Sequence, residues 1–574
     1  MDDLYDSSCF QTVKEWIRYF YGIIRETAGD VMKRIPIGLK DYKKLKDENY
    51  YVVDKSLMIK EYMDRGSEVT LITRPRRFGK TINMSMLAEF FDITKDSREI
   101  FKDTAVMHTS TADEINRYPT IFLTFADAKG SKENIIYQIK SQLMTAYDTY
   151  AHVYEELRTF ERVKLERIST GLMEEENVSL DKLTNAISFL MLKCHQYYGK
   201  KVMLFIDEYD TPFIEAHALG FYDELRGGLA SMLHTSLKTS NDLQYAMLTG
   251  IQRVAKENIF SDLNNPLVCT VKDREYAEYF GFTKQEVKEL LEAYGFVYDD
   301  AVRQMYDGYN MGGIDIYNPW SIINYVNRGE LIPYWVNTSS NKMIKSAMQD
   351  CEASFKDGYE ELIRTETVNT LVNFETSFFE IRETNSLWGL FVNAGYLTVE
   401  KVVDPLLGKY ILRIPNKEIV SEFSSLTAHY LHIDENSLDI LLDKFLQQKW
   451  DAFLNGYQKI LMKTMSYFDL INENSYQTLL LGMLIRLDNR YEIISNREQG
   501  EGRFDICLKN RNAEDPSIII ELKYTKDVSR DLQDLAHQAC IQITEKQYGY
   551  LMQKVIKIGL AHCGKQVRMY VQRD

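Results

Sequence analysis

Val69-Thr-Leu-Ile-Thr-Arg-Pro-Arg-Arg-Phe-Gly-Lys-Thr81 is the stretch of sequence that decides the fold. Its β-branched residues predict a short strand over Val69–Thr73, and Gly-Lys-Thr predicts a tight turn into a helix over Ile82–Phe91. A strand, a turn and a helix in this order form a phosphate-binding loop, because the backbone N–H groups at the helix N-terminus cradle an anion.

A loop of this kind binds a nucleotide in a defined way. Lys80 reaches the β- and γ-phosphates, and the hydroxyl of Thr81 binds Mg²⁺. The full consensus has a glycine five residues before Gly79, where this chain has Arg74. The residues of the loop that are predicted to bind the nucleotide are Arg77, Phe78, Gly79, Lys80 and Thr81.

A second motif is Lys201-Val-Met-Leu-Phe-Ile-Asp-Glu208, an apolar run that ends in two carboxylates. Such a run predicts a strand buried on both faces of a parallel sheet, with Asp207 at the carboxyl end, where ligands bind. Phosphoryl transfer needs a carboxylate that holds Mg²⁺ and a group that orients the attacking water, and Asp207 and Glu208 suit these roles. The alternative is an ordinary buried strand whose aspartate caps the next helix.

Two further strands are expected over Thr120–Phe125 and Gln244–Thr249, separated from the others by long helical stretches. Strands that alternate with helices predict a parallel sheet with helical crossovers. Thr249 and Arg253 follow the last of these strands, where Thr249 could sense the γ-phosphate and Arg253 could contact the nucleotide. A strand end and a surface salt bridge are the alternatives for these two residues.

The composition is that of a soluble globular protein. The 574 residues suggest about three domains, and 45% hydrophobic with 27% charged residues are ordinary values. No apolar run approaches the roughly 18 residues that span a bilayer, so no membrane partner is expected. The seven cysteines form no Cys-x-x-Cys pair and predict a reduced, cytoplasmic protein. A net charge of −15 argues against non-specific coating of nucleic acid but leaves room for a local site.

The pattern divides the chain into a helical segment (1–34), an α/β nucleotide-binding domain (35–270), a mostly helical region (271–464) and a last domain (465–574). A winged-helix-like unit is expected in the third segment, from a helix, two strands and a helix over Leu387–Tyr396, Leu397–Val402, Lys409–Ile414 and Lys417–Phe423. Aromatic residues interleaved with Gly, Asn and Pro are expected to pack a domain junction rather than to stack on bases: Tyr306, Tyr309, Tyr317 and Trp320.

The last domain carries a second constellation of charged residues. Gly502–Leu508 predicts a strand bearing Asp505, and Ser517–Lys523 predicts a strand whose alternation puts Glu521 and Lys523 on one face. A hairpin would bring Asp505 beside them, and carboxylates suit hard divalent ions such as Mg²⁺. The alternative is a solvated ion pair on a hairpin.

Helices flank this hairpin. Glu473 opens an apolar helix over Tyr476–Ile485, and Gln538 and Gln542 lie one turn apart on a helix over Ala536–Ile543. With closing strands over 555–561 and 567–571, this is the order of restriction-endonuclease-like folds. The predicted metal ligands are Asp505, Glu521 and Glu473, and the predicted catalytic residues are Asp505, Glu521, Lys523 and Gln538.

Several motifs, each short by itself, form a specific set: Thr73–Thr81, Phe205–Asp210, Leu248–Ile251, Ile259–Asn265, Tyr306–Tyr309, Tyr317–Ser321, Ser495–Glu498, Gly502–Asp505 and Ile520–Lys523. The set resembles a family of bacterial proteins that joins an AAA-ATPase-like domain to a C-terminal PD-(D/E)XK nuclease superfamily domain. The resemblance implies an α/β protein: a P-loop NTPase with a parallel sheet, a helical, winged-helix-like middle region and a restriction-endonuclease-like α/β domain. It implies ATP and Mg²⁺ as cofactors. A loop without the leading glycine is usual for that family, which accounts for Arg74.

We therefore expect a cytoplasmic protein in which ATP binding or hydrolysis controls a nuclease-like domain that acts on DNA or RNA. The alternative is a non-enzymatic, nucleotide-switched regulator whose C-terminal domain binds nucleic acid or a protein partner without cutting. The set of Asp505, Glu521 and Lys523 favours the enzyme, and the acidic net charge favours the regulator. A kinase is less favoured, because Glu208 suits water activation. Homo-oligomer formation is left open.

Overall fold

The structure is a computed structural model that describes residues 32–174, 179–253, 266–335, 340–349, 351–375, 383–430, 433–464, 473–487, 490–495, 498–499, 502–512, 514–549, 552 and 554–573. The predicted N-terminal helix and the motif Ile259–Asn265 lie outside these residues. The chain divides into two compact units. The first comprises residues 1–335 with 374–381 and 392–395, and the second comprises residues 336–373, 382–391 and 396–574.

The first unit is built on a parallel sheet of five strands in the order β2-β3-β4-β1-β5. The strands are β1 (Val69–Thr73), β2 (Thr120–Thr124), β3 (Val202–Asp207), β4 (Leu243–Gly250) and β5 (Leu267–Cys269). Every described pair in this sheet is parallel, so the carboxyl ends of the strands meet at one edge. All residues of β1 and β3 are buried, as expected for strands covered on both faces. The predicted parallel sheet is confirmed.

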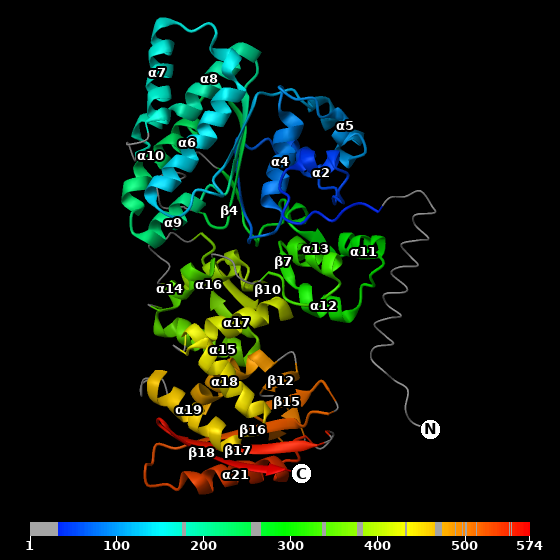
Figure 1. The fold of residues 1–574 in the computed structure, drawn as a ribbon, viewed down its shortest axis with the longest axis vertical. Helices are drawn as coiled ribbons and strands as arrows, with labels where there is room; N and C mark the ends of the chain where they lie inside the picture. The colour runs from blue at the N-terminus through cyan, green and yellow to red at the C-terminus, as the bar shows by residue number, and fades with distance from the viewer. Residues whose placement is uncertain are drawn as a thin grey trace. The chain divides into compact units, whose positions relative to one another are not determined.

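Helices cover both faces of this sheet (Figure 1). One face carries α2 (Tyr42–Asp47), α3 (Leu57–Arg65), α4 (Lys80–Phe91) and α5 (Arg98–Phe101). The other helices of this domain are α6 (Lys132–Thr149), α7 (Thr159–Met173), α8 (Ala186–Tyr198), α9 (Thr211–Leu219) and α10 (Tyr222–Leu237). None of the helices in the described part of the chain is long and apolar enough to cross a membrane.

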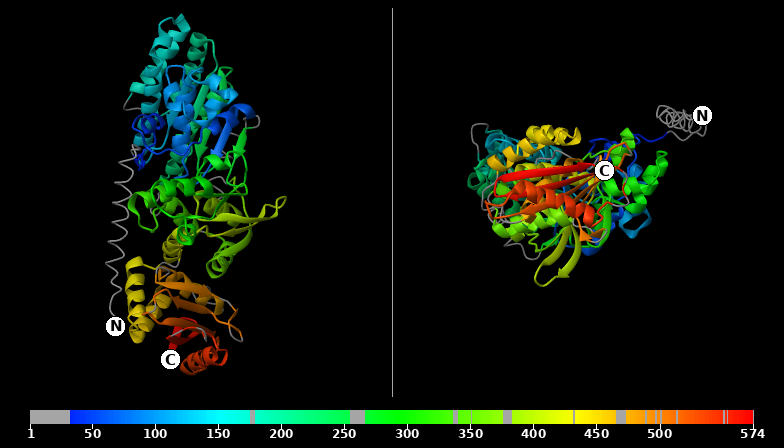
Figure 2. Two further views of the ribbon diagram at one scale, coloured as in Figure 1. Left: turned by 90° about the vertical axis from the view of Figure 1, so that its right-hand side faces the viewer. Right: turned by 90° about the horizontal axis from the view of Figure 1, so that it is seen from below.

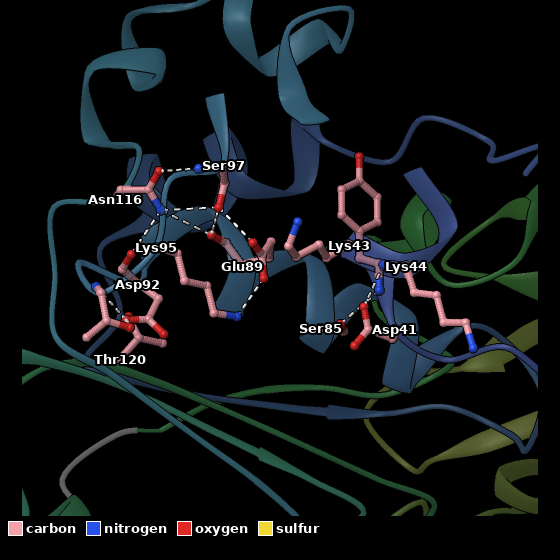
Figure 3. Close-up of polar contacts among 12 residues, drawn as sticks. Asp41, Lys43, Lys44, Ser85, Glu89, Asp92, Lys95, Ser97, Asn116 and Thr120 are labelled. Carbon is pink, nitrogen blue, oxygen red and sulfur yellow. Dashed lines mark hydrogen bonds and ion pairs between the residues drawn. The ribbon is translucent and has the colours of Figure 1, made fainter. Parts of the chain in front are cut away.

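α4, the helix that follows the phosphate-binding loop, ends in a buried polar network (Figure 3). The hydroxyl of Ser97 donates to the Glu89 carboxylate at 2.8 Å, and Lys95 pairs with the other Glu89 oxygen at 2.5 Å. The Asn116 amide accepts from the Ser97 N–H at 2.9 Å and donates to the Asp92 carbonyl at 2.9 Å. These bonds satisfy buried polar groups and anchor the helix end to the segment that leads into β2.

The first unit continues with a small antiparallel sheet in the order β6-β8-β7. Its elements are β6 (Phe282–Thr283), α11 (Lys284–Ala293), α12 (Asp300–Tyr306), β7 (Tyr309–Met311), β8 (Ile314–Tyr317) and α13 (Pro319–Arg328). These elements enclose a separate hydrophobic core that includes Leu290, Tyr306 and Ile322.

The second unit begins with α14 (Ser340–Gln349), α15 (Ala353–Thr365) and β9 (Thr367–Leu371). The predicted helix, two strands and helix follow as α16 (Thr384–Ala394), β10 (Thr398–Asp404), β11 (Lys409–Arg413) and α17 (Lys417–Tyr430). β9 joins them to give the sheet order β10-β11-β9, a strand that sequence did not predict. The β10–β11 hairpin extends away from the neighbouring helices (Figure 2), and Leu406 at its turn is exposed. Next come α18 (Glu435–Leu446) and α19 (Trp450–Thr464).

The last part of the second unit is a five-stranded mixed sheet in the order β12-β15-β16-β17-β18. Its strands are β12 (Tyr491–Ser495), β15 (Ile506–Asn510), β16 (Ser517–Tyr524), β17 (Val555–Cys563) and β18 (Gln566–Arg573), with a small pair β13 (Glu498–Gln499) and β14 (Gly502–Arg503). β15 and β16 are antiparallel, whereas β16 and β17 are parallel. The flanking helices are α20 (Glu473–Leu484) and α21 (Leu532–Glu545). The predicted hairpin and the helix–strand order are confirmed.

α21 packs directly on the backbone of β17, and a glycine makes this approach feasible. A Cβ atom added at Gly559 would lie 1.9 Å from the Ala536 carbonyl oxygen and 2.7 Å from the Cys540 nitrogen. These neighbours are helix backbone, which cannot rotate away as a flexible side chain could. The distance between this helix and the sheet is therefore set by the absence of a side chain at Gly559.

Gly559→Ala is expected to destabilise the second unit, because the added methyl group forces α21 away from β17. Overpacking of this kind lowers the free energy of unfolding by about 1–3 kcal/mol or more. Urea denaturation followed by circular dichroism measures the change. The matched control is Gly227→Ala in α10, where an added Cβ meets nothing within 4 Å. Equal stability of the two variants would contradict the close approach of α21.

Candidate functional site

The predicted nucleotide residues gather at the carboxyl edge of the first parallel sheet. Thr73, the last residue of β1, lies beside Gly250, the last residue of β4, and Thr124 of β2 lies beside Asp207 of β3. The loop after β1 enters α4 through Gly79, whose φ of +82° lies in the left-handed region that glycine adopts without strain. The loop therefore leaves the sheet at the end of β1, between β4 and β5, and the Thr81 that follows it reaches Asp207 at the end of β3.

Asp207 is the centre of this edge. The hydroxyls of Thr81 and Thr249 donate to its two carboxylate oxygens at 2.8 and 2.7 Å, and that of Thr124 donates at 3.3 Å. Burial raises the pKa of Asp207, and the hydroxyl donors act in the opposite direction. The structure thus brings together Thr81, Asp207 and Thr249, and it adds Thr124, which sequence reasoning placed in a strand without a role.

Lys80 is buried and turns back toward its own loop. Its ammonium group donates to the carbonyls of Arg74 and Pro75 at 3.0 and 2.9 Å. Burial lowers the pKa of Lys80, and the carboxylates of Glu208 and Asp207 act against that shift. The ammonium group can exchange loop carbonyls for the oxygens of a phosphate without leaving the loop.

Glu208 and Asp210 follow Asp207 and have different surroundings. Glu208 has a φ of 51°, an unusual backbone for a residue with a side chain, and its carboxylate accepts from the Thr211 hydroxyl at 3.1 Å. Burial opposes ionisation of Glu208, but nearby cations, with Lys80 the strongest, keep its pKa below the usual value. Glu208 therefore favours the ionised form.

Asp210 links the ends of two strands and was not singled out from the sequence. Its carboxylate accepts the backbone N–H groups of Ile251 and Gln252 at 2.8 and 2.9 Å, just after β4. Burial raises the pKa of Asp210 to about 6. Gly250 leaves space for this carboxylate, because a Cβ there would lie 2.7 Å from it. The signal was present in the sequence as the third acidic residue of Asp207–Asp210.

Other predicted nucleotide contacts have side chains that are engaged within the first unit. The Arg77 guanidinium lies over the Trp320 ring at 4.1 Å, and the buried Phe78 ring meets Tyr309 edge-on at 4.9 Å. Arg253 forms an ion pair with Glu375. Tyr309 and Trp320 therefore pack against the phosphate-binding loop within the first unit.

Arg74, at the position of the consensus glycine, is completely buried beneath this loop. Its guanidinium donates to the carbonyls of Thr73, Cys269 and Glu275 at 2.9, 3.0 and 3.1 Å. Burial lowers the pKa of Arg74 to about 10. The long side chain therefore ties the end of β1 to the end of β5.

The second constellation lies in the mixed sheet, where the hairpin register places Asp505 next to Glu521. Ile506 pairs with Ile520, so Asp505 and Glu521 flank that pair. The Asp505 carboxylate accepts the Leu522 N–H at 2.7 Å, and Lys523 donates to one Glu521 oxygen at 3.2 Å. The structure thus brings Asp505, Glu521 and Lys523 together.

Neighbouring groups only partly offset the negative charges of Asp505 and Glu521. Burial raises the pKa of Asp505 to about 6 and, together with the charge of Asp505, raises that of Glu521 to about 8. One carboxylate oxygen of Glu521, Oε2, is buried without a hydrogen-bond partner. A buried unpaired carboxylate oxygen is unfavourable unless a ligand completes it.

Glu473 begins α20, and its charge contributes to the raised pKa values of both carboxyl groups, after burial. In the described part of the chain, however, no three His, Cys, Asp or Glu side chains are grouped closely enough to hold a metal ion. The role of Glu473 as a third ligand therefore stays a prediction.

On α21 the structure brings Gln542, rather than Gln538, to the carboxylates. The Gln542 amide donates to Glu521, whereas the Gln538 amide donates to Asp534 at 2.7 Å on the exposed side of the helix. Both glutamines were recognised as one turn apart on a single helix. They lie in successive turns of α21, and the turn of Gln542 is the one that reaches Glu521.

The chain is similar to two known proteins over most of its length. A protein of Azotobacter chroococcum mcd 1, described as an uncharacterized protein in the vnfD 5′ region, is 26% identical over 408 residues, which cover 70% of this chain and 71% of its own length. The Walker-type ATPase paby2304 of Pyrococcus abyssi aligns with a TM-score of 0.35 and 11% identity, covering 68% of this chain and 97% of that chain.

Two family models match separate parts of the sequence. Residues 36–260 match the model of predicted AAA-ATPases, and they contain the phosphate-binding loop and Asp207. Residues 471–571 match the PD-(D/E)XK nuclease superfamily, and they contain Asp505, Glu521 and Lys523. The chain therefore combines an AAA-ATPase-like domain with a C-terminal domain of the PD-(D/E)XK nuclease superfamily, as the resemblance of its motifs implies.

Proposed function

We propose that the chain binds and hydrolyses ATP with Mg²⁺, and that the nucleotide controls a metal-dependent nuclease-like domain that acts on DNA or RNA. The observation that carries the proposal is the unpaired, buried Oε2 of Glu521 beside Asp505 and Lys523. A divalent cation at this place would give the unpaired oxygen a partner and offset the cost of burying two carboxylates side by side. The proposed domains comprise residues 1–34, 35–270, 271–464 and 465–574. We propose a cytoplasmic location for the protein and leave its oligomeric state open.

In the ATPase-like domain, the proposed work is divided among groups at the carboxyl edge of the sheet. Lys80 binds the β- and γ-phosphates, and Thr81 with Asp207 holds Mg²⁺. Glu208 orients the attacking water, and Thr249, which also bonds Asp207, senses the γ-phosphate. The loop backbone at residues 77–79 cradles the phosphates, and Arg253 lies at the end of this edge.

In the nuclease-like domain, Asp505 and Glu521 are the proposed ligands of a divalent cation, with Glu473 as a third carboxylate. Carboxylate oxygens and an unpaired buried oxygen fit Mg²⁺. A bound cation would lower the pKa of a water molecule and stabilise charge on a phosphate. Lys523 would orient the nucleophile, and Gln542 holds Glu521 in place. Gln538 is exposed on the same helix and bonds Asp534. Its catalytic role stays a prediction.

The alternative function is a nucleotide-switched regulator whose C-terminal domain binds nucleic acid or a protein partner without cutting. Two observations favour it: the net charge of −15, and the absence of a three-ligand metal group among the described residues. A cleavage assay distinguishes the two functions, because the regulator binds but leaves its partner intact.

Lys80→Ala is expected to lose ATP binding while the protein stays folded. The substitution removes the charge proposed to bind the phosphates, and the two carbonyls that Lys80 contacts belong to its own loop rather than to the core of the sheet. Titration calorimetry with MgATP measures the affinity. Lys102→Ala, which removes an exposed lysine from the same unit, is the control and is expected to bind as the wild type does. Wild-type affinity in Lys80→Ala would contradict the assignment.

Glu208→Gln is expected to bind ATP normally and to hydrolyse it about 10²–10⁴-fold more slowly, the usual contribution of a general base. The replacement keeps the shape of the side chain and leaves Asp207 with its hydroxyl donors. Steady-state phosphate release measures the rate. Equal rates in variant and wild type would remove Glu208 from the reaction.

Asp505→Ala and Lys523→Ala are each expected to abolish cleavage of nucleic acid and to leave ATP binding unchanged. The assay uses labelled single- and double-stranded DNA and RNA with Mg²⁺ or Mn²⁺, with and without ATP. Asp515→Ala is the control, because Asp515 pairs with Arg490 on the same domain outside the carboxylate site. Cleavage that survives both substitutions would remove the nuclease function from this site, and binding without cleavage by the wild type would support the regulator.

A further inference from the structure

The first turns of α20 are attached to the end of β17 by an aromatic contact. The ring of Tyr476 stacks on the imidazole of His562 with a centroid distance of 4.1 Å and an interplanar angle of 27°. The Tyr476 hydroxyl also donates to the Gly564 carbonyl at 2.6 Å. Both contacts hold the same side chain, so the start of α20 has a fixed position relative to β17.

His562 is itself fixed from a third element. It is completely buried, and its Nε2 lies 3.2 Å from the hydroxyl of Tyr457 in α19. The rings of Tyr457 and His562 meet edge-on at 5.8 Å. Burial lowers the pKa of His562 to about 3, so the imidazole is neutral and can accept or donate one hydrogen bond at this nitrogen.

The same turn of α20 also contacts the strand that carries Asp505. The Gln477 amide, next to Tyr476 in the sequence, donates to the Asp505 carbonyl at 2.8 Å. Glu473 lies one turn earlier on the same helix and acts electrostatically on Asp505 and Glu521. The beginning of α20 therefore contacts both His562, through Tyr476, and the backbone of Asp505, through Gln477.

We propose that His562 is a positioning residue for the carboxylate site: by stacking on Tyr476 and bonding Tyr457, it sets the position of α20, and through Gln477 it sets the backbone of Asp505. The proposal rests on the proposed role of Asp505 and Glu521 as ligands of a divalent cation. His562 lies one residue beyond Ala561, the partner of Lys523 in the parallel pair, and so it needs no contact with the ligands to act on them.

The chemistry of the imidazole explains why this position is sensitive. A phenylalanine would keep a ring against Tyr476 but would leave the buried hydroxyl of Tyr457 unpaired. A leucine would remove both the stacking and the hydrogen bond. His562→Phe therefore removes the hydrogen bond alone, whereas His562→Leu removes the hydrogen bond and the stacking. The larger loss of metal affinity is expected for His562→Leu.

The test is the affinity of the full-length protein for Mn²⁺, measured by titration calorimetry in the absence of nucleic acid. Wild type is expected to bind, and Asp505→Ala is expected to lose the site. His562→Leu is expected to weaken binding about 10–100-fold, the effect of residues that support metal ligands. His562→Phe is expected to weaken it less. Circular dichroism checks that each variant is folded, and His562→Phe provides the answer if His562→Leu does not fold.

A double-variant cycle separates positioning from general loss of stability. If His562 acts through Gln477, then His562→Leu has little further effect on Mn²⁺ affinity in a Gln477→Leu background. Ile556→Ala, a buried substitution at the other end of β17, is the matched control and is expected to leave the affinity unchanged.

Each failure has a separate meaning. No Mn²⁺ binding by the wild type would overturn both the proposed metal site and the role of His562. Binding that Asp505→Ala abolishes but His562→Leu leaves unchanged would overturn the role of His562 alone. Additive losses in the double variant, or an equal loss in Ile556→Ala, would also overturn it.

Discussion

The carboxylate of Asp207, held by threonine hydroxyls from neighbouring strand ends, is the interaction on which the first domain depends. Parallel strands bring their carboxyl ends to one edge, and at this edge the chain places Thr124, Thr249 and the loop residue Thr81 around one buried anion. Because an unpaired buried charge is very unfavourable, the donors and the carboxylate fix each other. The same bonds connect the phosphate-binding loop with three of the strands.

Residues far away in the sequence hold the phosphate-binding loop in place. Arg74 reaches the carbonyls of Cys269 and Glu275, while Tyr309 and Trp320 pack on Phe78 and Arg77. A loop with a glycine in place of Arg74 would lack the first set of contacts. The arginine therefore stabilises the shape of the loop by long-range hydrogen bonds rather than by the conformational freedom that glycine supplies.

The carboxylate site of the C-terminal domain differs from Asp207 in how fully its oxygens are hydrogen-bonded. Hydroxyl donors satisfy Asp207, whereas Glu521 retains a buried oxygen without a partner, and its pKa is raised to about 8. Two helices hold the strands that carry this strained pair. α21 brings Gln542 to Glu521, and α20 brings Gln477 to Asp505. Each carboxylate strand of the site is therefore held by a hydrogen bond from a different helix.

Local patterns in the sequence were sufficient to predict most strands and helices of both α/β domains, the Lys80–Thr81 loop, Asp207, and the hairpin that joins Asp505 to Glu521. Periodicity and turn residues act over a few positions, so these features need no knowledge of distant neighbours. Only the tertiary structure decided that Thr124 and Asp210 join the nucleotide edge, and that the side chains of Arg77, Phe78 and Arg253 are engaged elsewhere. These outcomes depend on which elements become neighbours across long sequence separations. The choice between Gln538 and Gln542 was decided in the same way, because their spacing on one helix treats them alike, and only the packing of α21 on the sheet brings Gln542 to Glu521 while Gln538 bonds the exposed Asp534.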